Sequence, residues 1–169
     1  MDTEKALQLA ESRLKEFAVS MNRPEENRLD VVIDRKNLIP AVSALLAEKQ
    51  WGYLSAITGL DNAAWKVDET TKEKSLDPSG GSLELLYHFC EGAAVATLRV
   101  SLPYDDAKVD TVCDLISSVS LYEREAAELF GIEFVGTPNT DRLVLPDSWP
   151  EGVYPLRKSF TGFENNAKG

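Results

Sequence analysis

The sequence has few of the residues that most often build catalytic and metal sites. It contains one histidine and two cysteines in 169 residues, so any serine or cysteine triad would have to use His88, and a four-ligand zinc or iron–sulfur site lacks donors. His88 has no further ligand at suitable spacing and is interpreted as an exposed or packed strand residue. Cys90 and Cys113 stand apart in apolar surroundings, and we expect two buried, reduced thiols rather than a disulfide.

Long apolar runs, an excess of basic charge and a phosphate-binding glycine motif are missing as well. The sequence has no run of about 20 apolar residues that would span a bilayer, and Met1 to Glu4 lack the basic and apolar regions of a signal peptide. The 28 acidic side chains outnumber the 18 basic ones, which gives a formal net charge of −10. An acidic chain repels phosphate backbones and anionic lipid headgroups. We therefore expect no nucleic acid partner and no direct membrane insertion.

The periodicity of the apolar residues predicts an α+β domain. Leu83 to Phe89 and Ala96 to Leu102 alternate with polar residues on either side of a glycine-bearing turn, which predicts an antiparallel hairpin. In chain order we expect a helix from Thr3 to Arg23, a strand at 29–33, a helix from Asn37 to Gly52, a strand at 53–60, a polar loop at 61–81, the hairpin, and helices at 109–119 and 122–130. This order favours helices on one face of a small mixed or antiparallel sheet.

Residues 131–169 differ in composition from the α+β body at 1–130. They hold four of the eight prolines and five of the ten glycines, so we expect an extended tail without a long helix or central strand. They also hold five aromatic residues, which disordered tails normally lack. The body carries 23 acidic and 14 basic side chains, whereas the tail carries five and four. This composition predicts a tail that wraps a partner; the alternative is a tail that folds back and uses Trp149 and Phe160 to close a satellite core.

A charged cluster lies where the last predicted helix leads into the tail. Glu123, Arg124 and Glu125 open this helix, and Glu128 follows at a spacing that allows it to pair with Arg124. Two interpretations stay open from the residues alone. The cluster is either a solvated, self-paired helix start or a set of groups that positions a neighbouring chain.

Basic residues of the tail also stand in an unusual setting. Arg142, Arg157 and Lys158 lie among apolar residues, and arginine beside aromatic anchors is frequent at protein interfaces. This setting favours contacts of the tail with another protein.

The most specific pattern in the sequence runs from Tyr122 to Lys158. It consists of Tyr122-Glu123-Arg124-Glu125-Ala126-Ala127-Glu128-Leu129-Phe130-Gly131-Ile132, Gly136, Pro138, Arg142-Leu143, Leu145-Pro146-Asp147, Trp149 and Pro155-Leu156-Arg157-Lys158. This pattern resembles the signature of the thirty-kilodalton-type subunit family of complex I, which includes relatives in complex-I-like membrane-bound hydrogenases. The body before it is similar to the domain of that family in pattern only.

The resemblance implies a non-catalytic subunit of the hydrophilic arm of a membrane-bound NAD(P)H or ferredoxin:quinone oxidoreductase that couples electron transfer to ion translocation. Such a subunit lies on the cytoplasmic face of the energy-converting membrane and holds no cofactor. Iron–sulfur clusters and a quinone site, or a nickel–iron centre, are then expected in partner subunits, and the tail runs over the large quinone-site subunit. The implied interface residues are Glu123, Arg124, Glu125, Phe130, Gly131, Pro138, Arg142, Pro146, Trp149, Pro155, Leu156, Arg157 and Lys158.

Other functions stay open. The segment between Trp149 and Pro155 is longer than the usual respiratory form and is similar to that of membrane-bound hydrogenases, so the equivalent subunit of a nickel–iron hydrogenase is the first alternative. More remote alternatives are a stand-alone small enzyme that uses Glu123, Glu125 and Glu128 as acid–base groups, and a soluble peptide-binding adaptor.

Overall fold

The computed structural model describes residues 2–47, 51–77 and 81–162 of the chain. Two expectations fall partly outside these ranges. Phe163, one of the five tail aromatics, lies outside the described residues, as does the centre of the predicted polar loop at 78–80. Everything below refers to the described ranges.

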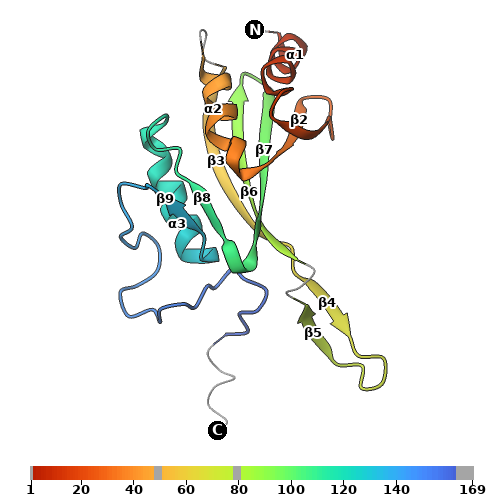
Figure 1. Ribbon diagram of the computed structural model, residues 1–169, viewed down its shortest axis with the longest axis vertical. Coiled ribbons are helices and arrows are strands. Elements are labelled where there is room, and N and C mark those ends of the chain that lie inside the picture. The colour runs from red at the N-terminus through yellow and green to blue at the C-terminus, as the bar shows by residue number, and fades with distance from the viewer. Residues whose placement is uncertain (1, 48–50, 78–80, 163–169) are drawn as a thin grey trace.

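A five-stranded sheet forms around the predicted hairpin (Figure 1). The hairpin strands pair antiparallel over their whole length, which confirms the prediction from their alternating pattern. The sheet order is β1-β2-β7-β6-β3, with β2 parallel to β7 and all other pairs antiparallel. Two strands, β1 and β3, therefore form the edges of the sheet. The strands are β1 (Ala18–Asn22), β2 (Arg28–Ile33), β3 (Tyr53–Asp61), β6 (Ser82–Glu91) and β7 (Ala94–Pro103).

Helices pack on the apolar face of this sheet, as the predicted α+β class requires. This face carries Leu85, Tyr87 and Phe89 of β6, all fully buried. The helices bury their own apolar stripes in the same core. Burial of these stripes, rather than helix propensity, supplies most of the stability of helices this short. The helices are α1 (Thr3–Leu14), α2 (Leu38–Leu46) and α3 (Ser120–Phe130), with short 3₁₀ turns η1 (Arg35–Asn37), η3 (Tyr104–Asp106) and η4 (Ser117–Val119).

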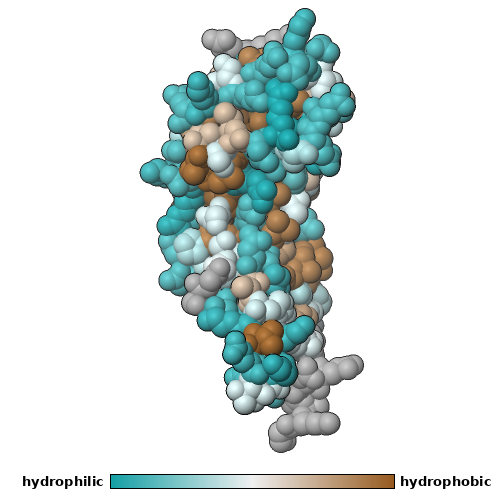
Figure 2. Space-filling model, turned by 90° about the vertical axis from the view of Figure 1, so that its right-hand side faces the viewer, coloured by the Kyte–Doolittle hydropathy of each residue, from teal (hydrophilic) through white to brown (hydrophobic). Residues whose placement is uncertain are grey.

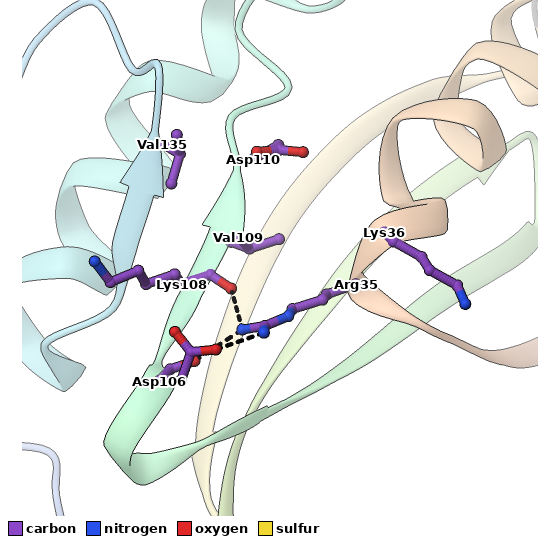
Figure 3. Close-up of a pocket in the computed structure, with 7 residues that line it drawn as sticks. All are labelled: Arg35, Lys36, Asp106, Lys108, Val109, Asp110 and Val135. Atoms are coloured by element: carbon purple, nitrogen blue, oxygen red, sulfur yellow. Dashed lines mark hydrogen bonds and ion pairs between the residues drawn. The ribbon is translucent and has the colours of Figure 1, made fainter.

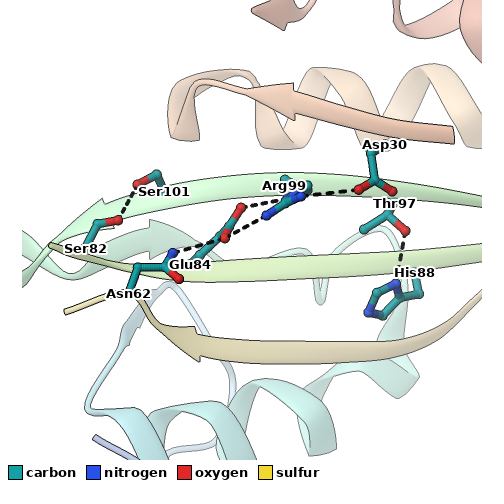
Figure 4. A network of polar contacts seen from close by, with 8 residues as sticks. All are labelled: Asp30, Asn62, Ser82, Glu84, His88, Thr97, Arg99 and Ser101. Carbon is teal, nitrogen blue, oxygen red and sulfur yellow. Dashed lines mark hydrogen bonds and ion pairs between the residues drawn. The ribbon is translucent and has the colours of Figure 1, made fainter. Parts of the chain in front are cut away.

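The opposite face of the sheet carries a polar network (Figure 4). Arg99 donates from Nε to Glu84 at 2.8 Å, and the same arginine contacts Asp30 at 3.3 Å. His88 lies between Thr97 and Thr58, with its ring nitrogens 3.1 and 3.0 Å from their hydroxyl oxygens. Burial, with a smaller contribution from a neighbouring arginine, lowers the pKa of His88. The histidine is thus a packed strand residue, and no cluster of metal-ligating side chains occurs within the described residues.

Three predicted elements were wrong. The helix expected to reach Arg23 ends at Leu14, and the chain continues as β1, because the edge of β2 offers backbone partners at this point. The polar loop at 61–81 contains a projecting hairpin of β4 (Ala64–Val67) and β5 (Lys74–Asp77), whose strands have only four residues each and are mostly exposed.

The third error concerns the helix predicted at 109–119. The apolar residues there follow a helical spacing, but the chain forms β8 (Lys108–Asp110), which pairs in parallel with β9 (Glu133–Val135). Arg35 of η1 reaches the free side of β8 and donates to the carbonyl oxygens of Asp106 and Lys108 (Figure 3). A surface cavity of about 300 Å³ lies beside this contact.

Two further findings bear on the sequence predictions. Cys90 and Cys113 are free and half-buried. In the part of the chain that the structure describes, no helix has the length and apolar character needed to cross a membrane.

Candidate docking surface on helix α3 and the C-terminal segment

The first charged residue of α3, Glu123, points into the protein. Its side chain is buried, and the residue is only 1% exposed. One carboxylate oxygen accepts a 2.6 Å hydrogen bond from the hydroxyl of Thr111, and the other accepts the backbone N–H of Val112 at 2.9 Å. Buried carboxylates need such donors, because an unpaired charge in a core is strongly destabilising. Glu123 therefore ties α3 to the segment that follows β8.

Two further charged groups of α3, Arg124 and Glu128, bind the backbone of the C-terminal segment. Arg124 donates to the carbonyl oxygens of Asp141 and Arg142 at 2.7 and 2.8 Å. The carboxylate of Glu128 accepts the consecutive backbone N–H groups of Leu143, Val144 and Leu145. Burial opposes the ionisation of Glu128, but these amides outweigh it, and the pKa of Glu128 is lowered. The two residues predicted to pair at i,i+4 spacing both bind the backbone of residues 141–145.

The end of α3 is closed by residues of the tail. Gly131 adopts a left-handed conformation with φ 68°, which glycine adopts without steric cost. A Cβ atom at this position would lie 2.4 Å from the ring of Tyr154, so the close approach also requires glycine. Arg157 donates from Nε to the carbonyl oxygen of Phe130 at 2.6 Å, and its guanidinium lies 4.6 Å from the centroid of the Tyr154 ring. The tail thereby satisfies helix-end carbonyl groups that would otherwise lack partners.

Lys158 connects the tail to the end of β3. Its backbone N–H donates to Asp61 at 2.7 Å, and its ammonium group donates to the carbonyl oxygen of Ala63 at 2.8 Å. Asp61 also accepts the hydroxyl of Tyr104, and burial together with this carboxylate raises the pKa of Tyr104 to about 12. The sequence analysis missed Asp61 and Tyr104. Nothing in the spacing could have found them, since Asp61 and Lys158 are 97 residues apart.

A second loop of the tail is closed by Arg142 and Trp149. Arg142 donates to the carbonyl oxygens of Pro146 and Trp149 at 2.6 and 2.8 Å. The indole N–H of Trp149 donates to Val153, and its ring lies 6.0 Å from the ring of Phe160. These contacts form the satellite cluster that the sequence analysis held as an alternative. The cationic groups of Arg124, Arg142, Arg157 and Lys158 all bind backbone oxygens of this chain.

This folded segment leaves aliphatic side chains at the surface. The four concerned are exposed between 42% and 55%: Val135, Leu143, Val144 and Leu156. Figure 2 shows the right-hand side of Figure 1, away from this segment, where apolar residues form small groups among hydrophilic ones. Among the other predicted interface residues, Pro138 and Pro146 are exposed, and Pro155 is half-buried. The hydrogen bonds to the Glu128 carboxylate fix the backbone of Leu143 and Val144, whose side chains stay exposed. Exposed apolar side chains on a fixed backbone make this surface a candidate for contact with another protein.

The glutamates of α3 do not converge on one site. Glu123 and Glu128 line a cavity of about 130 Å³ beside Phe134. Glu125 is exposed and lines a different cavity of about 190 Å³, with Phe130 and Leu156. Because two of the three carboxylates already accept backbone N–H groups, this arrangement does not favour the acid–base enzyme.

Comparison with known proteins agrees with this geometry. Residues 31–166 match the family described as the respiratory-chain NADH dehydrogenase 30 Kd subunit. The chain therefore belongs to this family, as its tail signature indicated.

Individual relatives come from several kinds of complex. The chain is 29% identical over 140 residues to a subunit of the F(420)H(2) dehydrogenase of Methanosarcina mazei, covering 82% of this chain and 78% of that protein. It is 36% identical over 87 residues to membrane-bound hydrogenase subunit beta of Pyrococcus furiosus, covering 51% and 50%. It is 30% identical over 133 residues to formate hydrogenlyase subunit 5 of Escherichia coli, which covers 79% of this chain but 21% of that longer protein.

Solved structures share the fold. A chain of the archaeal membrane-bound sulfane sulfur reductase superposes with a TM-score of 0.73 at 23% identity, covering 97% of this chain and 89% of that one. A trypsin-resistant fragment of Nqo5 superposes with a TM-score of 0.59 at 25% identity, covering 82% and 99%. The predicted fold class, an α+β domain with helices packed on a small mixed sheet, is confirmed.

Proposed function

We propose that this chain is a non-catalytic subunit of the peripheral arm of a complex-I-like membrane-bound oxidoreductase. In this role it holds the large subunit that carries the quinone site, and it stands next to iron–sulfur subunits on the cytoplasmic face. It carries no redox centre of its own. The coupling of electron transfer to ion translocation belongs to the whole complex.

The observation that carries this proposal is that charged and apolar side chains of the C-terminal segment have different roles. Its charged groups fold it against α3, whereas the side chains of Leu143, Val144 and Leu156 remain outside. A segment prepared in this way loses little conformational freedom on binding, which favours a stable contact. The tail proposed here is therefore a docking surface formed in advance, with the division between body (1–130) and tail (131–169) marking where the contact with the partner begins.

A nickel–iron hydrogenase is the second candidate for the parent complex. The identity of 36% to a membrane-bound hydrogenase subunit beta and of 30% to a formate hydrogenlyase subunit favours it. In that case the large partner subunit carries the nickel–iron centre, and this chain keeps the same docking role.

The test uses the tagged chain purified with its complex from its own membranes. We expect the large subunit to copurify with the wild type and to be lost, by roughly tenfold or more, when Leu143→Asp and Val144→Asp are combined. Val19→Asp is the matched control, because Val19 is 66% exposed on the far edge strand β1. Equal recovery with the double variant would refute the docking role.

Mass spectrometry of the copurified subunits distinguishes the two parent complexes. A large subunit with pairs of nickel–iron ligating cysteines identifies a hydrogenase, and one without them identifies a quinone-reducing enzyme. A stoichiometric cluster or flavin in the purified isolated chain would contradict the non-catalytic role.

A further inference from the structure

The outer edge of β3 has backbone groups that point away from the sheet. Asn62 donates to the carbonyl oxygen of Ser82, and the register with β6 is constant from Ala56 onward. In an antiparallel pair, residues alternate between those that exchange hydrogen bonds with the neighbour and those that do not. Ala56, Thr58 and Leu60 therefore bond to β6. The N–H and C=O groups of Ile57 and Gly59 point outward.

From Ala56 to Leu60 this edge lacks the charged residues, prolines and bulges that commonly protect an edge strand. From Tyr53 to Leu60 the strand contains no charged residue and no proline. Natural sheets commonly blunt their edges with lysine, proline or bulges, because an exposed edge pairs with other chains. The register shift of β3 lies between Leu54 and Ala56, before the free stretch begins. The uncharged stretch is therefore suited to pairing.

Helix α3 runs alongside the edge and forms a groove with it. At one end the Tyr122 hydroxyl donates to the carbonyl oxygen of Ser55 at 3.1 Å. At the other end a Cβ added at Gly59 would lie 2.5 Å from the Phe130 ring, so glycine allows the helix to approach. Between these contacts lies the cavity of about 190 Å³, with Ala126 and Leu129 on its helical side.

The side chains that line the groove determine which kind of segment can bind there. Ala126 and Leu129 give its helical wall apolar side chains, and Leu156 of the tail lines another part of it while remaining 52% exposed. Glu125 supplies the carboxylate of the groove and is exposed. The chain as a whole carries a net charge of −10. An occupant needs free backbone groups, a modest apolar side chain and a basic side chain.

We propose that this groove receives an extended segment of a neighbouring subunit, which adds to β3 as a sixth strand. The added strand exchanges hydrogen bonds with Ile57 and Gly59, places an apolar side chain in the cavity, and sets a lysine or arginine opposite Glu125. Strand addition beside a helix is an established way for domains to bind peptides. The inference rests on the proposed function, since the neighbouring subunit supplies the strand.

The experiment measures amide hydrogen exchange at single-residue level in the isolated chain and in the purified complex. We expect the Ile57 and Gly59 amides to exchange rapidly in the dilute isolated chain and at least roughly tenfold more slowly in the complex. Unchanged exchange at both amides in a complex that protects residues 137–162 would overturn the strand addition and leave the proposed function intact. If residues 137–162 also gain no protection, the proposed function fails as well.

Two further outcomes would overturn the proposal. Slow exchange at both amides in the dilute isolated chain would show that this chain closes its own edge. Protection that grows with the concentration of the isolated chain would identify a second copy as the occupant.

Charge reversal at Glu125 tests the basic residue of the added strand. Glu125→Lys should reduce the protection of Ile57 and Gly59 in the complex, whereas Glu69→Lys on the exposed β4–β5 hairpin should not. Circular dichroism of both isolated variants checks that the fold is kept. Full protection in the Glu125→Lys complex would overturn the assignment of a basic partner residue.

Discussion

The guanidinium of Arg157 donates a 2.6 Å hydrogen bond to the carbonyl oxygen of Phe130, the last residue of helix α3. A residue of the tail thus binds a carbonyl group at the C-terminal end of helix α3, next to the proposed docking surface. The same guanidinium stacks on Tyr154, whose ring covers Gly131. The predicted interface residues at this junction therefore act first on their own chain, and their contacts determine which side chains remain for a partner.

Replacing Arg157 by lysine should weaken this junction. A lysine cannot reproduce the planar, forked donor geometry or the stacking on Tyr154. Hydrogen bonds to charged groups contribute about 1.5–3 kcal/mol, so we expect a loss of roughly 1–2 kcal/mol in the free energy of unfolding, measured by denaturant titration. Arg28→Lys is the control, because Arg28 is an exposed arginine whose ion pair is with a glutamate three residues away. Equal effects of the two substitutions would contradict a stabilising role of the Arg157 contacts with Phe130 and Tyr154.

Replacing Glu128 by glutamine should release the segment from 141 to 145. The pKa of Glu128 is lowered in the folded chain, so the ionised carboxylate contributes stability above its unfolded pKa, near 4.5. This contribution is lost as the pH falls through the folded pKa. The stability difference between wild type and Glu128→Gln should therefore be largest at neutral pH and shrink below pH 4.5. A difference that stays constant from pH 7 to the acid limit would show that the charge plays no part.

Limited proteolysis is an independent test of whether Glu128→Gln releases the segment. At neutral pH, cleavage near Leu143 to Leu145 should be faster in Glu128→Gln than in wild type, because the three backbone N–H groups lose a charged acceptor. Glu151→Gln serves as control, since Glu151 is exposed elsewhere in the tail.

Replacing Gly131 by alanine should destabilise the chain through two separable effects. A non-glycine residue in a left-handed conformation costs about 1–2 kcal/mol, and the added Cβ would also collide with the Tyr154 ring. Combining Gly131→Ala with Tyr154→Ala should remove the collision and leave the conformational cost. A double-mutant cycle of unfolding free energies measures this coupling. Strictly additive effects would show that the ring does not press on Gly131.

Two tyrosines should respond differently to loss of the hydroxyl group. Within the described residues, the buried Tyr87 hydroxyl has no hydrogen-bond partner, whereas the Tyr104 hydroxyl donates to Asp61. An unsatisfied buried polar group costs about 1–3 kcal/mol. Tyr87→Phe should therefore leave the melting temperature unchanged or raise it, and Tyr104→Phe should lower it. A clear loss of stability in Tyr87→Phe would reveal a partner for that hydroxyl.

The elements that the sequence predicted well are those whose pattern comes from the core itself. The alternation from Leu83 to Leu102 reflects a sheet with one apolar face, and the stripe of α3 reflects burial against that sheet. Glycine at 131 marked the helix end because of its left-handed conformation. In these cases the local pattern and the tertiary environment agree.

The elements that were missed depend on partners distant in sequence. Val109, Val112 and Val119 have helical spacing, yet β9 supplies a backbone partner, and the Glu123 carboxylate takes the N–H of Val112. Strand β1 shows no clear alternation and exists because β2 offers an edge. The strands of the β4–β5 hairpin are four residues long and mostly exposed, which is too short for an alternating pattern to stand out from a loop.

The sequence predicted which residues make up the candidate site, but not which atoms they contact. The sequence marked Arg124, Arg142, Arg157 and Lys158 as interface residues, and in the structure each binds backbone oxygens of the chain, in α3, in the tail or just after β3. Spacing alone does not reveal which atoms a long basic side chain reaches. That these residues contribute to a partner contact stays a prediction.

Hydroxyl-radical footprinting tests the central claim most directly, because it reports the exposure of individual side chains. In the isolated chain, Leu143, Val144 and Leu156 should be oxidised about as readily as Val19, since all four are substantially exposed. In the purified complex the first three should be protected several-fold, whereas Val19 should not. Equal oxidation of Leu143, Val144 and Leu156 in both states would show that no subunit covers the surface of α3 and the tail, and would contradict the account.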